Sequence, residues 1–430
     1  MNRAWAALVL LCVGCTLGGQ AAPAGKVLRI GVDLPLTGPE GRAGATALNG
    51  IRYFVRTHPM LAGFTVSLTV ADDAQAGAAS ASRGLANLQT FLKDAGVVAM
   101  IGPFDAAVAR LQIPTASAAG FAMVTPATSN PCLTRDTYMP TLLTPNRSAV
   151  TCKQVGLPAA SELRPGHTNN FFRLTTTDEL QGAAAADYAF DTLHVLRAAA
   201  ISDHELYGQG LAGAFTARFQ RRGGTVVGRV DVDPANADAS DFLDRVKQDG
   251  AQAIYFGGGA GAGCAIRARM AAIFPPGDAT PFLGPDGIAH DPDCIRAAGS
   301  NSTGIIATVP IVDASSRAEA QATIDEFKKA YPRQADFGPY TMLAYDATAV
   351  LYAALDKAIA GAGGGLPARD AVIAELAKTK AFQGTTGTLG FDQAGDNTNR
   401  LVSLFAAPGS DPAARWRLAG TVDYSARLPY

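Results

Sequence analysis

The stretch Val97-Val98-Ala99-Met100-Ile101-Gly102-Pro103 is a short apolar run that ends abruptly in Gly-Pro. A stretch with helical spacing follows, and the chain then repeats the pattern in Phe121-Ala122-Met123-Val124-Thr125-Pro126-Ala127-Thr128-Ser129. Strands of a parallel sheet are buried on both faces, so they read as continuous apolar runs of this kind. The loops at their carboxyl ends line the crevice where α/β proteins bind ligands, and N–H groups of the following helices can bind an anion there. The two runs therefore predict neighbouring strands of a parallel sheet beside a binding crevice.

Strands and helices alternate in the same way towards the N-terminus. Strands are predicted at Val27–Asp33 and Phe64–Val70, and apolar residues at helical spacing follow each of them, from Ala47 to Val55 and from Ala81 to Leu92. After the second quoted run, the chain from Pro126 to Pro165 lacks periodicity and is predicted to be a long surface excursion held by a disulfide. The alternation predicts a doubly wound parallel sheet.

The alternation resumes near Phe171, and a helix is predicted from Thr177 or Asp178 to about Arg197. Further short apolar runs then predict a second set of strands, at Ala198–Ser202, Thr225–Asp231, Ala251–Phe256, Pro281–Gly284, Gly304–Val309, Thr388–Asp392, Leu401–Ala406 and Trp416–Val422. Helices are predicted between them, from Gly208, through Phe242 and Val246, at Ile266–Ala272, Ala318–Ala330, Thr341–Ala360 and Ala368–Lys378. The chain therefore contains two similar α/β halves.

The composition is that of a globular protein with more than one domain. The chain has 430 residues, of which 48% are hydrophobic and 17% are charged, and its formal net charge is −1. This length exceeds one ordinary domain, and the hydrophobic fraction excludes a disordered protein. Because the sequence has no basic block, binding to nucleic acid or to a membrane surface through a charged patch is not expected.

The N-terminus resembles a signal peptide, with Arg3 ahead of the apolar run Ala4–Val13. That run is too short to span a bilayer, and no later stretch reaches the length of a transmembrane helix. Gly14-Cys15 resembles a bacterial lipobox, which predicts lipidation of Cys15 and a tether over 16–24. The alternative is ordinary cleavage near Ala24, at the end of a segment of small residues. Both alternatives predict an exported protein, in the periplasm or cell envelope.

Four cysteines remain once the export segment, residues 1–24, is removed: Cys132, Cys152, Cys264 and Cys294. An even number in an exported chain suggests two disulfides. Proximity in sequence favours Cys132–Cys152 and Cys264–Cys294, although four cysteines allow three pairings. No two of them have the C-x-x-C spacing of zinc sites, so no metal site is expected.

Several motifs occur in an order that resembles a known family. They are Thr37-Gly38-Pro39, Ala71-Asp72-Asp73, Ile101-Gly102-Pro103, Val124 to Ser129, Phe172-Arg173-Leu174, Tyr207-Gly208-Gln209-Gly210, Gly257-Gly258 and Gly284-Pro285-Asp286-Gly287. Together they resemble the leucine/isoleucine/valine-binding family, the type I periplasmic solute-binding proteins of branched-chain amino acid ABC importers. The resemblance covers nearly the whole mature chain.

The resemblance implies two α/β lobes joined by three crossover segments, with the solute in the cleft between them. It places the first lobe at 27–173 plus 310–388 and the second at 174–309 plus 389–430. It implies a monomeric binding protein without enzymatic activity or cofactor, which delivers an amino acid or a related solute to an ABC permease.

The resemblance also implies two loops that bind the carboxylate of the solute. Ala127 and Ser129 match the loop after the second quoted strand, with Ser129 in place of a threonine. In the other loop, Asp105-Ala106 stands where the family usually has serine. Asp105 adds a carboxylate, which would favour an additional cationic group on the solute. A wider pocket or a local realignment is the alternative interpretation of such departures from the family.

Four further positions correspond to residues that line the cleft in the family. Asp286 matches the acid that accepts the ammonium of the solute, and Tyr207 matches a tyrosine lining the cleft. Gly259 and Ala43 lie at or near positions where the family has aromatic residues. These differences leave the identity of the solute open.

Two other functions are weighed against transport. The first is a ligand sensor on the same fold, for amides or other small polar solutes. The second is a nucleotide-dependent enzyme, suggested by the glycine run Gly257–Gly263 between a strand and a helix. That run contains neither G-x-G-x-x-G nor G-x-x-x-x-G-K-[ST], so a close-approach turn at the cleft is the better interpretation.

Overall fold

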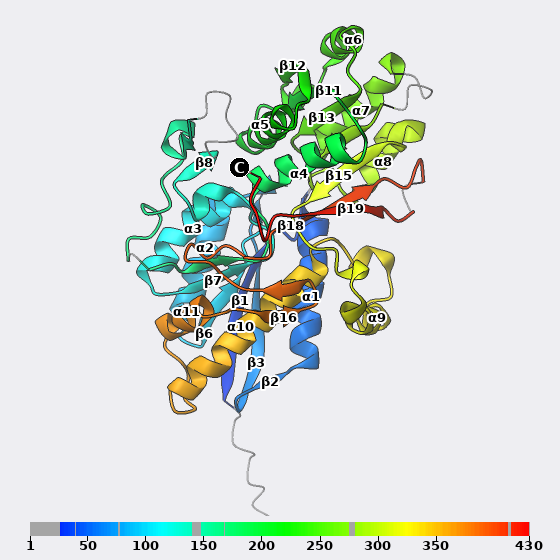
Figure 1. Ribbon diagram of the computed structural model, residues 1–430. Coiled ribbons are helices and arrows are strands. Elements are labelled where there is room, and N and C mark those ends of the chain that lie inside the picture. The colour runs from blue at the N-terminus through cyan, green and yellow to red at the C-terminus, as the bar shows by residue number, and fades with distance from the viewer. Residues whose placement is uncertain are drawn as a thin grey trace, which may run out of the picture.

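The computed structural model describes residues 26–38, 40–75, 78–139, 148–166, 168–274, 280–411 and 414–429. The predicted export segment with Cys15 lies outside these residues. The chain forms two large sheets, each covered by helices on both faces, and the halves built on them are called here the first and second lobes (Figure 1). The predicted α/β class with two doubly wound halves is confirmed.

The first lobe contains a six-stranded sheet in the order β10-β7-β6-β1-β3-β2. All its neighbouring strands are parallel except β2 and β3. The strands are β1 (Val27–Leu34), β2 (Met60–Leu61), β3 (Phe64–Asp72), β6 (Val97–Ile101), β7 (Ala122–Thr125) and β10 (Phe171–Arg173). All residues of β6 and β7 are buried, as their continuous apolar runs predict.

Two sets of helices cover this sheet. Helices α1 (Gly41–Thr57), α10 (Thr341–Gly361) and α11 (Arg369–Ala377) share one hydrophobic core with β1. Helices α2 (Ala81–Lys93) and α3 (Ala106–Ala118) pack on the other face. Helix α9 (Gln321–Ala330) packs beside α1, where the rings of Tyr53 and Phe327 meet edge to face.

The second lobe contains a seven-stranded sheet in the order β12-β11-β13-β14-β15-β18-β19. The first five strands are parallel, and β18 and β19 are antiparallel additions at one edge. The strands are β11 (Arg197–Ser202), β12 (Thr225–Asp231), β13 (Ala253–Gly257), β14 (Phe282–Gly284), β15 (Ile305–Val309), β18 (Leu401–Ala406) and β19 (Arg417–Asp423).

Helices again cover both faces of this sheet. Helices α4 (Asp178–Asp191) and α5 (Leu206–Arg221) share a core with β11 and β13 on one face. Helices α6 (Ser240–Gln248), α7 (Ala260–Ile273) and α8 (Pro292–Ala298) pack on the other. Short two-stranded sheets join β4 (Ala74–Gln75) to β5 (Ala78–Ala79), β8 (Thr137–Met139) to β9 (Val150–Thr151), and β16 (Phe382–Gly384) to β17 (Gly387–Leu389).

The chain passes between the lobes after β10, after β15 and before β18, and these segments lie side by side. The Thr176 N–H donates to the Pro310 carbonyl at 2.8 Å, and the Asn397 amide donates to the Leu174 carbonyl at 2.8 Å. Beside them the fully buried Arg173 guanidinium pairs with Asp396 at 2.7 Å. The crossings therefore form one hydrogen-bonded bundle.

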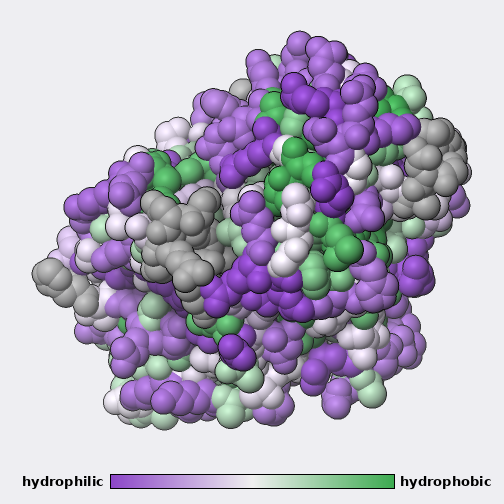
Figure 2. Space-filling view, turned by 45° about the horizontal axis from the view of Figure 1, so that its top comes forward, coloured by the Kyte–Doolittle hydropathy of each residue, from purple (hydrophilic) through white to green (hydrophobic). Residues whose placement is uncertain are grey.

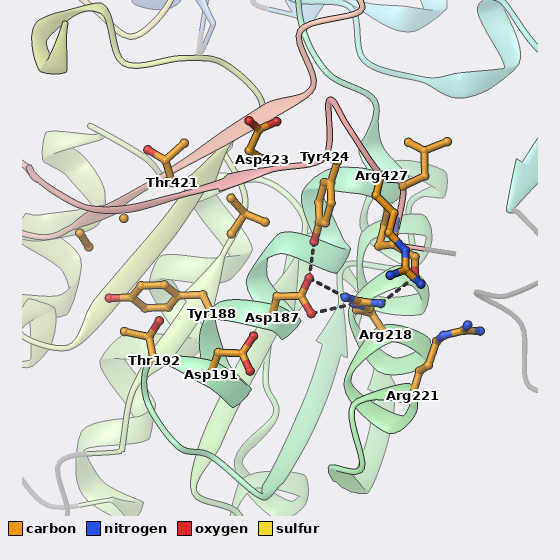
Figure 3. Close-up of a pocket in the computed structure, with 15 residues that line it drawn as sticks. Asp187, Tyr188, Asp191, Thr192, Arg218, Arg221, Thr421, Asp423, Tyr424 and Arg427 are labelled. Atoms are coloured by element: carbon orange, nitrogen blue, oxygen red, sulfur yellow. Dashed lines mark hydrogen bonds and ion pairs between the residues drawn. The ribbon is translucent and has the colours of Figure 1, made fainter.

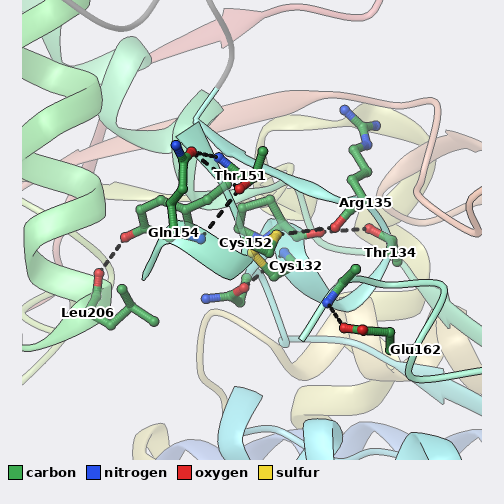
Figure 4. The surroundings of a disulfide bond; sticks show 12 residues. Cys132, Thr134, Arg135, Thr151, Cys152, Gln154, Glu162 and Leu206 are labelled. Atoms are coloured by element: carbon green, nitrogen blue, oxygen red, sulfur yellow. Dashed lines mark hydrogen bonds between the residues drawn. A yellow bond between two sulfur atoms is a disulfide. The ribbon is translucent and has the colours of Figure 1, made fainter. Parts of the chain in front are cut away.

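Both disulfides have the favoured pairing, Cys132–Cys152 and Cys264–Cys294. The prediction that 126–165 is a surface excursion is wrong for its cysteines, since Cys132 and Cys152 are buried. The segment leaves the first lobe and packs on α5, where the Tyr138 hydroxyl donates to the Leu206 carbonyl at 2.6 Å (Figure 4). Gly210 is needed there, because a Cβ on it would lie 2.2 Å from the Tyr138 oxygen.

Most helix and strand predictions agree with the structure, and β12 and β18 have the predicted bounds. The helix predicted to reach Arg197 ends at Asp191, because Arg197 already belongs to β11 and the turn between them places His194 at a φ of 55°. Helix α8 is not predicted; Asp291 caps it by accepting from the N–H groups of Asp293 and Cys294.

Hydrophilic residues cover most of the face shown in Figure 2, and hydrophobic residues appear in limited groups. Large exposed hydrophobic side chains are separated along the described chain: Val27, Met60, Leu111, Leu196 and Leu366. Within the described residues, no helix combines the length and apolar character needed to cross a membrane.

Candidate functional site

Asp286 lies just after β14, and its carboxylate accepts hydrogen bonds from both lobes. Oδ1 accepts from the Tyr207 hydroxyl at 2.6 Å and from the Gln181 amide at 2.8 Å, both in the second lobe. Oδ2 accepts from the Tyr340 hydroxyl at 2.7 Å, at the start of α10 in the first lobe. This carboxylate therefore joins the two lobes through hydrogen bonds.

The two tyrosines remain donors at this site. Burial, together with the charge of Asp286, raises the pKa of Tyr207 and of Tyr340 well above the ordinary tyrosine value. Tyr340 is further positioned by the Phe104 ring, which meets it edge to face at 4.9 Å. Sequence analysis identified Tyr207 and Asp286 but missed Tyr340 and Gln181, because they lie in segments without a distinguishing motif.

The loop after β7 lies on the first-lobe side of the crossings. Thr125 Oγ1 accepts from the N–H groups of Ala127 and Thr128, each at 3.2 Å. Ala127 is buried, Ser129 is partly exposed, and the Ser129 carbonyl accepts from the Asp178 N–H at 3.2 Å. The N–H group of Ala127, expected to meet a solute carboxylate, is therefore already engaged within the loop, together with that of Thr128.

The loop after β6 is closed by its own acid. Asp105 is the N-cap of α3, and its Oδ1 accepts from the N–H groups of Ala107 and Val108 at 2.7 and 3.0 Å. Ala106 is the first residue of that helix. The expectation that this helix N-terminus offers these N–H groups to an anion is wrong, because the Asp105 carboxylate already occupies them.

Gly259 is exposed at the start of α7, and a Cβ placed on it would meet no atom within 4 Å. Its N–H donates to Asp203 at 3.0 Å, and burial raises the pKa of the Asp203 carboxyl. Gly258 and Gly259 thus form the turn between β13 and α7, which Asp203 anchors, and the space beside Gly259 is open where an aromatic side chain could stand.

Buried polar atoms without a protein partner surround Asp286. Among the described residues these include Asp178 Oδ1, Gln181 Oε1 and the Tyr255 hydroxyl. The charge of Asp286 contributes to a raised pKa at both Asp178 and Tyr255, after the larger effect of burial. The pKa of Asp178 rises to about 7, although a hydrogen bond with the Ser129 side chain acts to lower it. Unpaired buried polar atoms are suited to a bound solute or water.

A second group of acids lies at the carboxyl edge of the first-lobe sheet. Asp33 and Asp73 are fully buried; Asn87 and Gln112 donate to Asp33, while neither carboxylate oxygen of Asp73 has a partner. Burial is the main reason that the pKa of Asp33 rises to about 7 and that of Asp73 to about 8, and the neighbouring acids raise both further.

A cavity of about 590 Å³ lies elsewhere on the second lobe, between α4, α5 and the C-terminal segment (Figure 3). The Arg218 guanidinium donates there to both oxygens of Asp187 and to the Pro429 carbonyl, and the Tyr424 hydroxyl also donates to Asp187. These polar groups satisfy one another and dock the C-terminal segment. None of the site residues predicted from the sequence lines this cavity.

The part of the chain that the structure describes contains no group of three or more His, Cys, Asp or Glu side chains arranged to hold a metal ion.

Comparisons with known proteins agree with the architecture. A model of a periplasmic binding protein family matches residues 27–408. A Leu/Ile/Val-binding protein homologue of Brucella melitensis is 27% identical over 391 residues, covering 90% of this chain and 93% of the relative.

Two solved structures illustrate the range of solutes bound by this fold. The branched-chain amino acid substrate-binding protein LivJ of Streptococcus pneumoniae, in complex with isoleucine, has a TM-score of 0.71 at 17% identity, covering 93% of this chain and 99% of that one. A solute-binding protein of Rhodopseudomonas palustris, in complex with p-hydroxybenzoic acid, has a TM-score of 0.72 at 18% identity, with coverages of 94% and 99%.

Proposed function

The chain belongs to the periplasmic binding protein family, and we propose on this basis that it binds an amino acid or a related small polar solute for an ABC importer. Curated relatives that match most of the chain are named as Leu/Ile/Val-binding proteins. The solute would bind between the lobes, and the closed form would deliver it to the permease.

The observation that carries the proposal is the position of Asp286. Its carboxylate accepts from Tyr207 of one lobe and Tyr340 of the other, so the acid lies where the lobes meet. An ammonium enclosed between lobes loses its water, and a carboxylate replaces both the charge and the hydrogen bonds. Ala106, Ala127, Ser129 and Gly259 are proposed to line the same cleft.

Lobe closure is the proposed mechanism. The lobes would be 27–173 plus 310–388 and 174–309 plus 389–430, moving about the bundle of crossings at Leu174, Pro310 and Asn397. A solute bound to one lobe adds contacts to the other, so binding shifts the population towards the closed form.

A screen of solutes tests this function. Leucine, isoleucine, lysine, leucinamide and p-hydroxybenzoate are each added to the purified protein, and the midpoint of thermal unfolding is measured. A solute that binds only the folded state adds about 2.7 kcal/mol to the free energy of unfolding when its concentration is a hundredfold above Kd. The midpoint of thermal unfolding rises accordingly. If none of the amino compounds raises it, binding of an amino acid is refuted.

A ligand sensor would bind the same solutes without transport, and uptake assays in cells lacking the protein distinguish the two roles. The fold neighbour with p-hydroxybenzoic acid shows that this architecture also accommodates solutes without an amine. A nucleotide-dependent enzyme is less well supported, since the matching curated relatives are named as binding proteins.

Export of the chain, as a monomer with residues 1–24 removed or with a lipid on Cys15, belongs to the same proposal. Cell fractionation with intact-mass measurement of the mature N-terminus tests it, and retention of Met1 in a cytoplasmic protein would refute export.

A further inference from the structure

We infer that the cleft selects a solute with net positive charge, such as a basic amino acid or an amine without a free carboxylate, rather than a neutral zwitterion. This inference rests on the proposed function and specifies the solute of the same site. Two independent observations carry it: an excess of carboxylates without counter-ions, and an excess of buried acceptors over free donors.

The carboxylates converge from both lobes. Neighbouring parallel strands β1 and β6 end at the same edge of the first-lobe sheet, and Glu40 and Asp105 follow their ends. Phe104, next to Asp105, packs on Tyr340, which donates to Asp286. From the second lobe come Asp286, and Asp178 at the first turn of α4. Desolvation, and after it the charges of Asp105 and Asp286, raises the pKa of the Glu40 carboxyl to about 7, although Glu40 is exposed. Glu40, Asp105 and Asp286 therefore interact electrostatically.

Cationic side chains do not balance these acids. Across the described ranges no ion pair joins a lysine or arginine to any of these four acids. Arg173 is already engaged by Asp396. Arg42 is exposed in α1. Burial, and after it the positive charge of Arg42, lowers the pKa of His290 in the loop after Asp286 to about 4. These acids therefore give their surroundings a negative potential.

The hydrogen-bonding groups are unbalanced in the same direction. Asp178 Oδ1 and Gln181 Oε1 are buried acceptors without a partner, on side chains that are at most 4% exposed. The N–H groups of α3 and of the loop after β7 that would hold an anion are instead engaged by Asp105 and Thr125.

An ammonium supplies three donors and no acceptor, so it satisfies such a site, whereas a carboxylate adds only acceptors. A neutral zwitterion brings one group of each kind and leaves the excess of carboxylates uncompensated. A second ammonium, or the replacement of the solute carboxylate by an amide, removes that deficit. The chemistry of the cleft therefore favours a cation.

Calorimetry with four probes tests the inference on the mature protein. Leucine is the zwitterion; lysine adds an ammonium; leucinamide removes the carboxylate; and 1,5-diaminopentane has two ammonium groups and no carboxylate. We expect lysine and leucinamide to bind about tenfold more tightly than leucine at low salt. This preference should shrink as ionic strength rises from about 20 mM to about 500 mM.

The variant Glu40→Gln should reduce the preference for lysine over leucine by about threefold, because it removes one charge while leaving Asp286 in place. Glu319→Gln, at an exposed glutamate in the segment leading to α9, is the matched control and should leave the preference unchanged. Circular dichroism checks that both variants are folded.

The outcomes separate this inference from the proposed function. Tighter binding of leucine than of lysine and leucinamide would overturn the inference and leave the function intact. An equal preference in Glu40→Gln and wild type would also overturn it. If none of the four probes binds, both fall.

Discussion

Replacing Asp286 by asparagine tests the centre of the proposed site. The carboxylate accepts from Tyr207, Gln181 and Tyr340 at 2.6 to 2.8 Å, and a carboxylate has room for about four such bonds. One acceptor position and the negative charge therefore remain for an ammonium. Asp286→Asn keeps the shape and removes the charge.

The size of the effect follows from what the amide retains. Its carbonyl oxygen can still accept from Tyr207 and Gln181, while its NH₂ group faces the Tyr340 hydroxyl, which can turn to accept. The principal loss is then the charge-assisted bond to the solute, about 1.5–3 kcal/mol. That corresponds to a Kd about ten- to a hundredfold higher.

Isothermal titration with leucine and lysine measures this loss. Tyr340→Phe is the control, because it removes one donor and keeps the charge; its ammonium-binding cost should be smaller than that of Asp286→Asn. Ser129→Ala should also cost less, since it removes one hydroxyl. If Asp286→Asn binds both amino acids as tightly as wild type, the ammonium does not meet Asp286 and the site is misplaced.

Three other predictions concern stability and the cell. Removing one disulfide with Cys132→Ala and Cys152→Ala should lower the free energy of unfolding by about 3 kcal/mol, measured by chemical denaturation with the Cys264 pair intact; an unchanged midpoint would contradict the structural role of the excursion. Burial raises the pKa of folded Asp73 to about 8, so the folded protein holds a proton that the unfolded chain has lost above pH 4. The stabilisation from this proton is fully present below pH 4. It disappears as the pH rises to about 8. Asp73→Asn should therefore flatten the fall in stability between pH 5 and 8 by about 3–4 kcal/mol, and an equally steep profile would show that the carboxyl is not buried with its proton. If Cys15 is lipidated, Cys15→Ser should move the protein from the membrane fraction to the soluble periplasm, whereas unchanged partitioning favours cleavage near Ala24.

The sequence alone determined the strands, their alternation with helices and the two disulfides. Buried parallel strands need a continuous apolar run, which is a local property, so β12 and β18 have the predicted bounds. The short separations of 20 and 30 residues favoured the cysteine pairing that the structure shows, although four cysteines allow three pairings. Asp286 and Tyr207 were recognisable because each lies in a motif of glycines.

The tertiary structure alone decided how those residues are used. Tyr340 and Gln181 contact Asp286 from 54 and 105 residues away along the chain, so no local pattern marks them. Asp105 caps α3 by accepting from two of its N–H groups. Aspartate is a common N-cap residue, but the sequence does not show whether a given aspartate caps a helix. The charge balance around Asp286 depends on the same long-range contacts. Folding determines which elements lie beside a carboxylate, and these elements supply its partners.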